Sequence, residues 1–202
     1  AITGRAAARG AAVTVVETAG LDPLATDREL ALAVCAAHGV PAALALPAME
    51  AAGRDPGFFF TRPIAVDGKD LCFANAFACN DTESLAMLWQ DSGNGHDRAT
   101  PVVLLNARRD RPLSTRRFLD FLAAQAPAPL LFLTGDPLAS RLARGSGIAP
   151  AAVRRLRARS PEAALGELAA AAAPGATIWG IGNFEGFGAR MLAALPSGEA
   201  PC

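Results

Sequence analysis

The segment "NARRDRPLS" (106–114) gathers the side chains of this sequence that are best suited to hold an anion. Arg108, Arg109 and Arg111 surround Asp110 there. A guanidinium group binds phosphate or carboxylate through two parallel hydrogen bonds, and a neighbouring carboxylate can hold one arginine in place. The segment therefore predicts an anion site. The alternative is a solvated charge cluster, whose internal ion pair contributes little.

A second polar cluster, "FACNDTES" (77–84), follows an apolar run and precedes an expected helix. Asn80, Asp81 or Thr82 can cap that helix. Capping uses only one or two such side chains, so the others are available to contact a ligand. Both interpretations remain open at this point.

Expected strands and helices that alternate along the chain position these two clusters. The strands are expected at 71–78, 100–107, 129–135, 152–158 and 176–182, and the helices at 81–91, 113–125, 137–144, 161–172 and 187–195. The runs 102–105 and 130–133 are continuously apolar, which is typical of strands that are covered on both faces. The alternation predicts an α/β fold with a doubly wound, mostly parallel sheet.

The carboxyl ends of parallel strands meet at one edge of such a sheet, where ligands bind. Four expected strands end in polar or glycine-rich segments, which are "CNDTES", "NARRDRPLS", "TGDP" and "GIGNFEG". Asn80, Asn106 and Asn183 belong to three of these segments. We therefore expect one ligand-facing edge, while Gly135 and Asp136 can also be explained as a turn and a helix cap.

The first quarter of the chain has a different pattern. The elements expected there are a strand at 11–17 and helices at 27–38 and 41–53. Pro47 is expected to bend or divide the second helix. The stretch "GRDPGFFFTRP" (53–63) combines two glycines with two prolines and breaks the pattern. We therefore predict two domains, at residues 1–55 and 56–202.

Two glycine-containing motifs argue against familiar nucleotide sites. "WGIGNFEGFG" (179–188) is one residue longer than the dinucleotide fingerprint, so nicotinamide binding is not expected. A glycine turn that packs a helix close to the sheet explains it better, and an anion at that helix N-terminus is the functional alternative. A phosphate-binding loop needs Gly-Lys followed by Ser or Thr. The one lysine of the chain, Lys69, precedes Asp70 and lies between two expected strands.

Composition narrows the class of protein further. Nineteen basic and nineteen acidic residues cancel, so no broad nucleic-acid surface is expected. The four cysteines form no Cys-x-x-Cys pair and the two histidines lie far apart, so we expect no metal site in this chain. No apolar run approaches ~18 residues, so no membrane-spanning helix is expected.

Three motifs in order resemble one bacterial enzyme family. "ACND" (78–81), "NARRDR" (106–111) and "WGIGN" (179–183) are similar to segments of the ligase subunit of poly-γ-glutamate synthase. "FACNDTESLAML" also resembles the Ala-His-Asn-Pro motif of the related Mur ligases and folylpolyglutamate synthases, with Cys79 in place of His and Asp81 in place of Pro. "DRELALAVCAAHGV" and "RDPGFFFTRPI" look like the close of the central domain of that subunit and its interdomain hinge. The resemblance covers residues 15–195.

The resemblance implies an ATP-dependent amide ligase that extends a poly-γ-glutamate chain with glutamate through an acyl phosphate. It also implies a Rossmann-like, Mur-ligase C-terminal domain at 56–202, preceded by a remnant of the central ligase domain at 1–55. In the family the nucleotide loop and magnesium ligands lie in the central domain. This chain is therefore expected to be a C-terminal fragment, or half of a split ligase, that is inactive alone. ATP and Mg²⁺ are then bound mainly by the missing N-terminal region.

The expected partners are glutamate, the poly-γ-glutamate chain, the missing N-terminal ligase region and membrane subunits of a synthase complex, with no nucleic acid. The expected location is the cytoplasm, peripheral to the inner membrane through those subunits. The alternative is a non-catalytic Rossmann-like module that binds an anion or a partner protein. A Gly-Lys-Ser/Thr loop upstream would favour the ligase.

The resemblance also suggests roles for single residues. Arg108 or Arg109, with Arg111, is expected to face phosphate or a glutamate carboxylate, and Asp110 to orient them. Asn80 and Asp81 are expected to position the incoming amino acid or to contact nucleotide. Arg62, just past the hinge, is expected to contact nucleotide. Asn106 and Asn183 are the other expected substrate- or nucleotide-binding residues.

Overall fold

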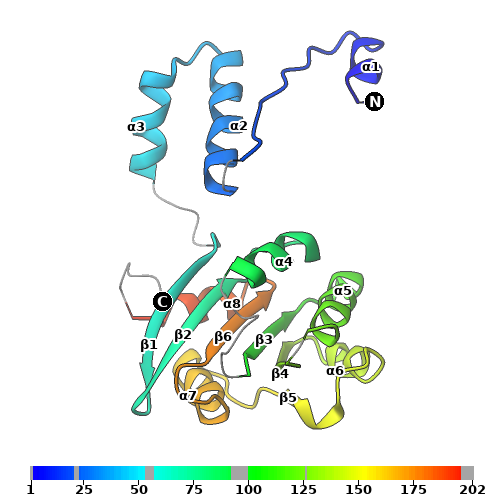
Figure 1. The fold of residues 1–202 in the computed structure, drawn as a ribbon, viewed down its shortest axis with the longest axis vertical. Coiled ribbons are helices and arrows are strands. Elements are labelled where there is room, and N and C mark those ends of the chain that lie inside the picture. The colour runs from blue at the N-terminus through cyan, green and yellow to red at the C-terminus, as the bar shows by residue number, and fades with distance from the viewer. Residues whose placement is uncertain (1, 21–22, 53–56, 92–99, 126, 197–202) are drawn as a thin grey trace. The chain divides into compact units, whose positions relative to one another are not determined.

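The computed structural model describes residues 2–20, 23–52, 57–91, 100–125 and 127–196. The chain divides into two compact units, Ala1–Arg54 and Asp55–Cys202, and each is considered by itself (Figure 1). The segment "GNGHD" (93–97), whose glycines predict a loop, lies outside the described residues.

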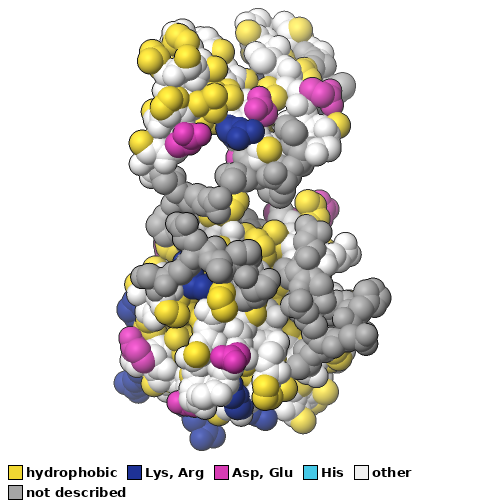
Figure 2. All heavy atoms as spheres, turned by 60° about the vertical axis from the view of Figure 1, so that its left-hand side comes forward, with side chains coloured by type: hydrophobic (Ala, Val, Ile, Leu, Met, Phe, Trp, Pro, Cys, Tyr) yellow, Lys and Arg dark blue, Asp and Glu magenta, His cyan; other side chains and the backbone are white. Residues whose placement is uncertain are grey.

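The first unit is helical. Its elements are α1 (Ile2–Ala7), α2 (Pro23–Ala37) and α3 (Ala42–Ala52). The strand expected at 11–17 is wrong, because these residues are irregular and Val15 is 78% exposed. A segment of β-branched residues forms a stable strand only when a neighbouring strand pairs with it. The described part of this unit contains no strand that could do so. Pro47 lies inside α3. Hydrophobic side chains stand at the surface of this unit (Figure 2). Leu44 and Val34 are among the exposed ones.

The second unit is built on a six-stranded sheet. Its strands are β1 (Phe60–Val66), β2 (Lys69–Ala76), β3 (Val102–Ala107), β4 (Leu130–Gly135), β5 (Val153–Arg155) and β6 (Thr177–Gly182). Their order is β1-β2-β6-β3-β4-β5. β1 pairs antiparallel with β2, whereas the remaining pairs are parallel. The predicted α/β fold with a mostly parallel sheet is confirmed.

Helices cover both faces of this sheet (Figure 1). They are α4 (Thr82–Asp91), α5 (Pro112–Ala123), α6 (Leu138–Ala143), α7 (Pro161–Ala171) and α8 (Phe187–Ala193), and the 3₁₀ turn Pro150–Ala152 precedes β5. One buried cluster joins the sheet to α7 and α8 and includes Phe132 and Leu168. The other joins it to α4, α5 and α6 and includes Phe118 and Trp179. Burying each such side chain contributes about 1.5–3 kcal/mol, so the two faces hold the sheet between them.

Two strands differ from expectation. β5 ends at Arg155, not at 158, because the Glu167 carboxylate accepts the backbone N–H groups of Arg157 and Ala158 at 3.0 and 2.9 Å, in place of a neighbouring strand. β1 begins inside the stretch 53–63 that was expected to be a break.

β1 and β2 form a hairpin around Asp67 and Gly68, whose φ angles are 49° and 75°. An Asp-Gly pair suits this turn, because both positions require positive φ. The Gly-Lys dipeptide thus belongs to a hairpin, and Lys69 Nζ donates to the carbonyls of Ala169 and Ala172 at 2.8 and 2.9 Å. Within the described residues, no helix is long and apolar enough to cross a bilayer.

Candidate functional site

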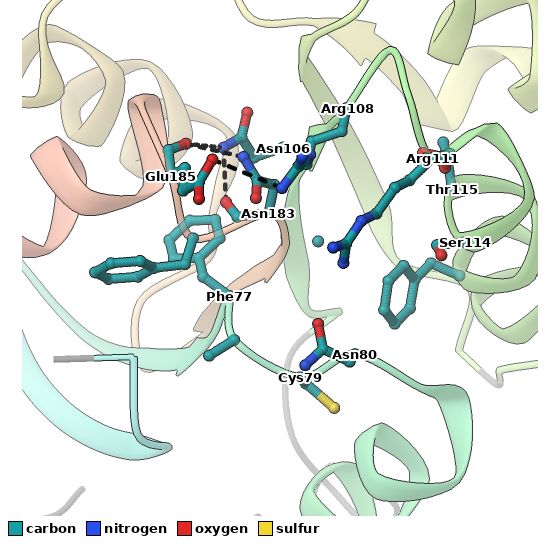
Figure 3. A pocket seen from close by; sticks show the side chains of 14 residues that line it. Phe77, Cys79, Asn80, Asn106, Arg108, Arg111, Ser114, Thr115, Asn183 and Glu185 are labelled. Atoms are coloured by element: carbon teal, nitrogen blue, oxygen red, sulfur yellow. Dashed lines mark hydrogen bonds and ion pairs between the residues drawn. The ribbon is translucent and has the colours of Figure 1, made fainter. Parts of the chain in front are cut away.

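A pocket of about 250 Å³ opens at the carboxyl ends of β2, β6 and β3, three neighbouring strands of the sheet. Its polar lining comes from the loops after these strands and from the start of α5 (Figure 3). It contains Asn80, Asn106, Arg108, Arg111, Ser114, Thr115, Asn183 and Glu185. The topology therefore brings together five of the residues expected at the site, which are Asn80, Asn106, Arg108, Arg111 and Asn183.

Asn106 joins two of these loops. Its side chain is only 4% exposed, and its Nδ2 donates to the carbonyls of Asn183 and Glu185 at 2.7 and 3.2 Å. The backbone N–H of Asn183 donates in return to the Asn106 carbonyl at 2.8 Å. Replacing a buried side-chain amide that satisfies its hydrogen-bond partners leaves those partners unpaired, which destabilises the fold. Asn106 therefore fixes the β6 loop against β3 and has little donor capacity left for a ligand.

Glycines allow this close approach of the loops. Gly182 has a φ of 95°, and a Cβ there would lie 2.6 Å from the Asn106 carbonyl oxygen. A Cβ at Gly188, at the start of α8, would lie 2.6 Å from the Asn183 carbonyl oxygen. The glycine segment thus packs its helix close to the sheet, as its spacing indicates.

Arg108 is held between two carboxylates. Its Nε and Nη2 donate to the Asp110 carboxylate at 2.8 and 2.7 Å, and Glu185 lies 3.6 Å from Nη1 on the other side. The bidentate bond to Arg108 lowers the pKa of Asp110, and the same bond raises the pKa of Arg108. Asp110 therefore orients one arginine of the loop, and the loop keeps a fixed shape at the mouth of the pocket.

Arg111 differs from Arg108. Its guanidinium points into the space that Asn80 and Ser114 border (Figure 3). No carboxylate of the described chain lies within ion-pair distance of it. Arg111 immediately precedes α5, and its backbone carbonyl accepts a hydrogen bond from the Thr115 hydroxyl at 3.3 Å. The pocket thus contains one positioned guanidinium with free donors, which suits a carboxylate or phosphoryl group.

One residue of the "CNDTES" cluster, Asp81, caps α4. The Asp81 carboxylate accepts the backbone N–H of Ser84 at 2.7 Å and its hydroxyl at 3.0 Å, and the backbone bond is the main reason that the pKa of Asp81 is lowered. Burial raises the pKa of the Cys79 thiol to about 11, so it is not a nucleophile at neutral pH. Asn80 is exposed toward the pocket. The cluster therefore divides into a cap and one residue that is available to a ligand.

Four expected site residues lie away from the pocket lining. Arg109 is exposed, and Asp110 and Asp81 act through Arg108 and α4. Arg62 lies on β1, where its Nη1 donates to the Pro196 carbonyl at 2.9 Å. Asp136 caps α6 by accepting the Leu138 N–H at 3.0 Å.

Other lining residues were not singled out from the sequence. Ser114, Thr115 and Phe118 follow Arg111 by three, four and seven positions, the spacing of one helix face, which could have marked them. Glu185 carries no comparable signal, because its contact with Arg108 depends on the sheet order. In the described chain, no three His, Cys, Asp or Glu side chains come together as a metal site would need.

Residues 61–197 match the family model of the poly-gamma-glutamate synthase CapB C-terminal domain. The chain belongs to this family. It is 30% identical over 123 residues to "Capsule biosynthesis protein CapB" of Bacillus anthracis, covering 59% of this chain and 26% of that protein. It is 28% identical over 164 residues to "PGA synthase CapB" of Bacillus subtilis strain 168, covering 79% of this chain and 41% of that protein. No solved structure gives a significant match.

The resemblance to the poly-γ-glutamate synthase subunit is thereby confirmed. The chain spans between about a quarter and two fifths of these two relatives. Every lining residue of the pocket lies within the matched range, so the pocket belongs to the CapB C-terminal domain itself.

Proposed function

We propose that this chain is the C-terminal, substrate-side part of an ATP-dependent amide ligase that adds glutamate to a poly-γ-glutamate chain. The family and the printed names of both relatives support a synthase of this polymer. The observation that carries the proposal is the Arg111 guanidinium, which is exposed to the pocket and has no carboxylate partner in the described chain. Glutamate and an acyl phosphate both supply the anion that such a group binds.

The proposed reaction has two steps. The terminal γ-carboxylate of the polymer attacks the terminal phosphorus of ATP, which forms an acyl phosphate and releases ADP. The amino group of the incoming glutamate then attacks the carbonyl carbon, the bond to phosphate breaks, and the nitrogen loses a proton as the amide forms. Negative charge stays on phosphate and on the glutamate carboxylates throughout, so fixed cationic donors are the useful contribution of a protein.

The residues of the pocket divide this work. Arg111 holds a carboxylate of glutamate or the phosphoryl oxygens, and Asn80 offers an amide beside it. Arg108, oriented by Asp110, adds positive potential at the mouth. Asn106 and Asn183 keep the two loops in register. Arg109, Asp81 and Arg62 remain predictions as direct contacts, because none of them lines the pocket.

The proposal extends to the parts that act with this chain. A central, Mur-ligase-like domain, to which residues 1–54 belong, supplies the nucleotide site together with any bound Mg²⁺. The second unit is then its Rossmann-like partner domain. The complete enzyme works in the cytoplasm beside membrane subunits of a synthase complex.

Glutamate-dependent phosphate release tests the proposal. It is measured first with this chain and then with this chain joined to the sequence that precedes it in its gene. We expect release only from the longer protein, and its loss on Arg111→Gln. Release by the 202-residue chain itself would contradict the division of labour.

Calorimetry separates the ligase from a non-catalytic module. We expect glutamate to bind this chain, Arg111→Gln to weaken binding, and the exposed Arg117→Gln to leave it unchanged. Glutamate binding without phosphate release from the longer protein would favour a binding module.

A further inference from the structure

A second recess lies at the β5 border of the sheet, the edge opposite to β1. Its volume is about 240 Å³, and it is lined by residues of α6, the following loop, the 3₁₀ turn and β5. Three arginines from two separate elements belong to its lining, Arg144 after α6 and Arg154 and Arg155 on β5. The Arg154 guanidinium lies over the Phe132 ring, 5.8 Å from its centroid, on the α7 and α8 side of the sheet. Arg155 is on the α6 side, and its Nη2 donates to the Gly135 carbonyl at 3.4 Å. Among the described residues that line it, none is acidic.

The recess is the centre of a basic stretch of sequence. Between Arg141 and Arg159 the chain contains six arginines and no acidic residue, although its charges cancel overall. Within the described chain none of the six takes part in an ion pair. Glu167 contacts this stretch only through backbone N–H groups. These arginines therefore present a positive potential, and Glu167 is the carboxylate that contacts the stretch.

Protection of the sheet edge does not account for this arrangement. Charged side chains on an edge strand prevent pairing with another chain, and this explains Arg154 and Arg155. It does not explain Arg144, which follows a helix and yet lines the same recess. Arg144 and Arg155, from a helix end and a strand, can together supply donors to a bound anion.

We propose that the recess bordered by Arg144 and Arg155 binds carboxylates of the poly-γ-glutamate chain at a distance from its reacting end. This inference rests on the proposed function. In that polymer the γ-carboxyl is consumed in the amide, so every residue keeps a free α-carboxylate and two methylene groups. Guanidinium groups match the carboxylates, and the aliphatic side chains of Ile148 and Val153 match the methylenes.

Multivalency makes the polymer the favoured ligand. A single exposed ion pair contributes little, so free glutamate binds weakly here. Many carboxylates on one chain raise the effective concentration of each after the first has bound. The described lining offers no aromatic ring on which a nucleobase could stack, which disfavours single-stranded nucleic acid. A carboxylate side group of a flexible polymer can enter this recess. A flat bilayer surface contacts protruding side chains instead, so the recess disfavours a membrane as the ligand.

Fluorescence anisotropy of this chain with a labelled poly-γ-glutamate oligomer tests the proposal. The test variant combines Arg144→Gln with Arg155→Gln. The matched control combines Arg117→Gln with Arg190→Gln, which removes the same charge from exposed positions on α5 and α8. We expect the test variant to bind about fivefold more weakly, because two exposed contacts are lost, and the control to change less than about twofold.

Further arms separate the alternatives. Arg144→Lys with Arg155→Lys keeps the charge and is expected to bind between wild type and the Gln variant, which shows that the loss does not come from unfolding. Equal weakening in the test variant and the control would overturn the site. So would recess-dependent binding of phosphatidylglycerol vesicles or an oligonucleotide as tight as that of the polymer.

The assay needs no ATP turnover, so it is independent of the ligase proposal. Polymer binding that Arg111→Gln abolishes and the recess variant spares would place the polymer in the first pocket alone and overturn this inference. Absence of phosphate release from the longer protein, with recess-dependent polymer binding intact, would instead remove the ligase and leave a polymer-binding module.

Discussion

The arginines of the pocket and those of the β5 recess use the same chemistry under different constraints. In the pocket, Arg108 is tied to Asp110 at 2.7 Å, while Arg111 beside it is left open. In the recess, Arg144, Arg154 and Arg155 have no carboxylate partner in the described chain.

The difference shows that some arginines of a protein can hold a loop in position while others attract an anionic ligand. A guanidinium that already holds a carboxylate has lost much of its freedom, so it fixes the loop and its neighbour. Guanidinium groups without a carboxylate partner keep donors for other anions and attract them with modest affinity. The pocket is therefore suited to a single small ligand in one orientation, and the recess to a flexible polyanion.

Arg111→Gln tests the role of the pocket most directly, because it removes the guanidinium that is left open there. In the complete synthase we expect kcat to fall on the order of 100-fold, because a donor aimed at charge in the transition state is removed. Glutamate-dependent phosphate release measures it. Arg117→Gln removes the same charge from the exposed surface of α5 and is expected to keep wild-type activity. Equal rates for the two variants would show that Arg111 does not face the reacting groups.

Gly182→Ala tests the framework that holds the pocket. The Cβ would lie 2.6 Å from the Asn106 carbonyl oxygen, and the φ of 95° is unfavourable to alanine. We expect the free energy of unfolding to fall by roughly 3 kcal/mol, through overpacking and backbone strain together. Urea denaturation of this chain measures it.

Gly175→Ala supplies the control for that variant. Gly175 has a φ of 75° but no heavy atom within 4 Å of the Cβ position, so only the strain, about 1 kcal/mol, is expected. Equal losses in both alanine variants would mean that the contact with β3 contributes nothing.

Asp110→Asn sharpens the comparison, because it removes the carboxylate that pairs with Arg108 and leaves Arg108, like the recess arginines, without that ion pair. We expect kcat/KM of the complete synthase to fall about 10-fold, as orientation of the loop is lost while its positive charge remains. Asp120→Asn is the matched control, since Asp120 forms a similar 2.7 Å ion pair with Arg116 away from the pocket. A comparable fall in both variants would point to a general loss of stability, which thermal unfolding would reveal.

Asp81→Ala has the smallest expected effect. It removes the cap of α4 and is expected to lower the free energy of unfolding by about 1 kcal/mol at neutral pH. Because the pKa of Asp81 is lowered in the folded chain, its stabilisation is present above about pH 4 and is lost as pH falls through the folded-state pKa. Thermal unfolding at several pH values measures it.

The difference between Asp81→Ala and wild type should therefore shrink toward about pH 3. Glu83→Gln, in the same first turn but without the capping bonds, should show a smaller difference at neutral pH. A gap that stays constant with pH would mean that the carboxylate charge plays no part in the cap.

The sheet could be predicted because its signals are local. Continuous apolar runs at 102–105 and 130–133 lie in β3 and β4, both covered on two faces. The same local signal was misleading at 11–17, where no partner strand is described. β-Structure depends on pairing, so a β-branched segment by itself is not enough.

The pocket could be predicted in part. Asn80, Asn106, Arg108, Arg111 and Asn183 were identified because strand ends in such a sheet share an edge. The contact of Glu185 with Arg108 could not be foreseen, since it joins loops 77 residues apart through the adjacency of β6 and β3. The recess was likewise hidden, because Arg144 and Arg155 line one recess only when α6 packs beside β5.

The bonds of Lys69 make this chain a convenient object for chemical labelling. It carries the one ε-amine of the sequence, and that amine is occupied by the two carbonyls at the end of α7. We therefore expect an acylating reagent to modify the side-chain amine faster when the hairpin separates from α7. The rate of that modification, measured by mass spectrometry, reports how often this corner of the sheet opens, and the measurement needs no mutation.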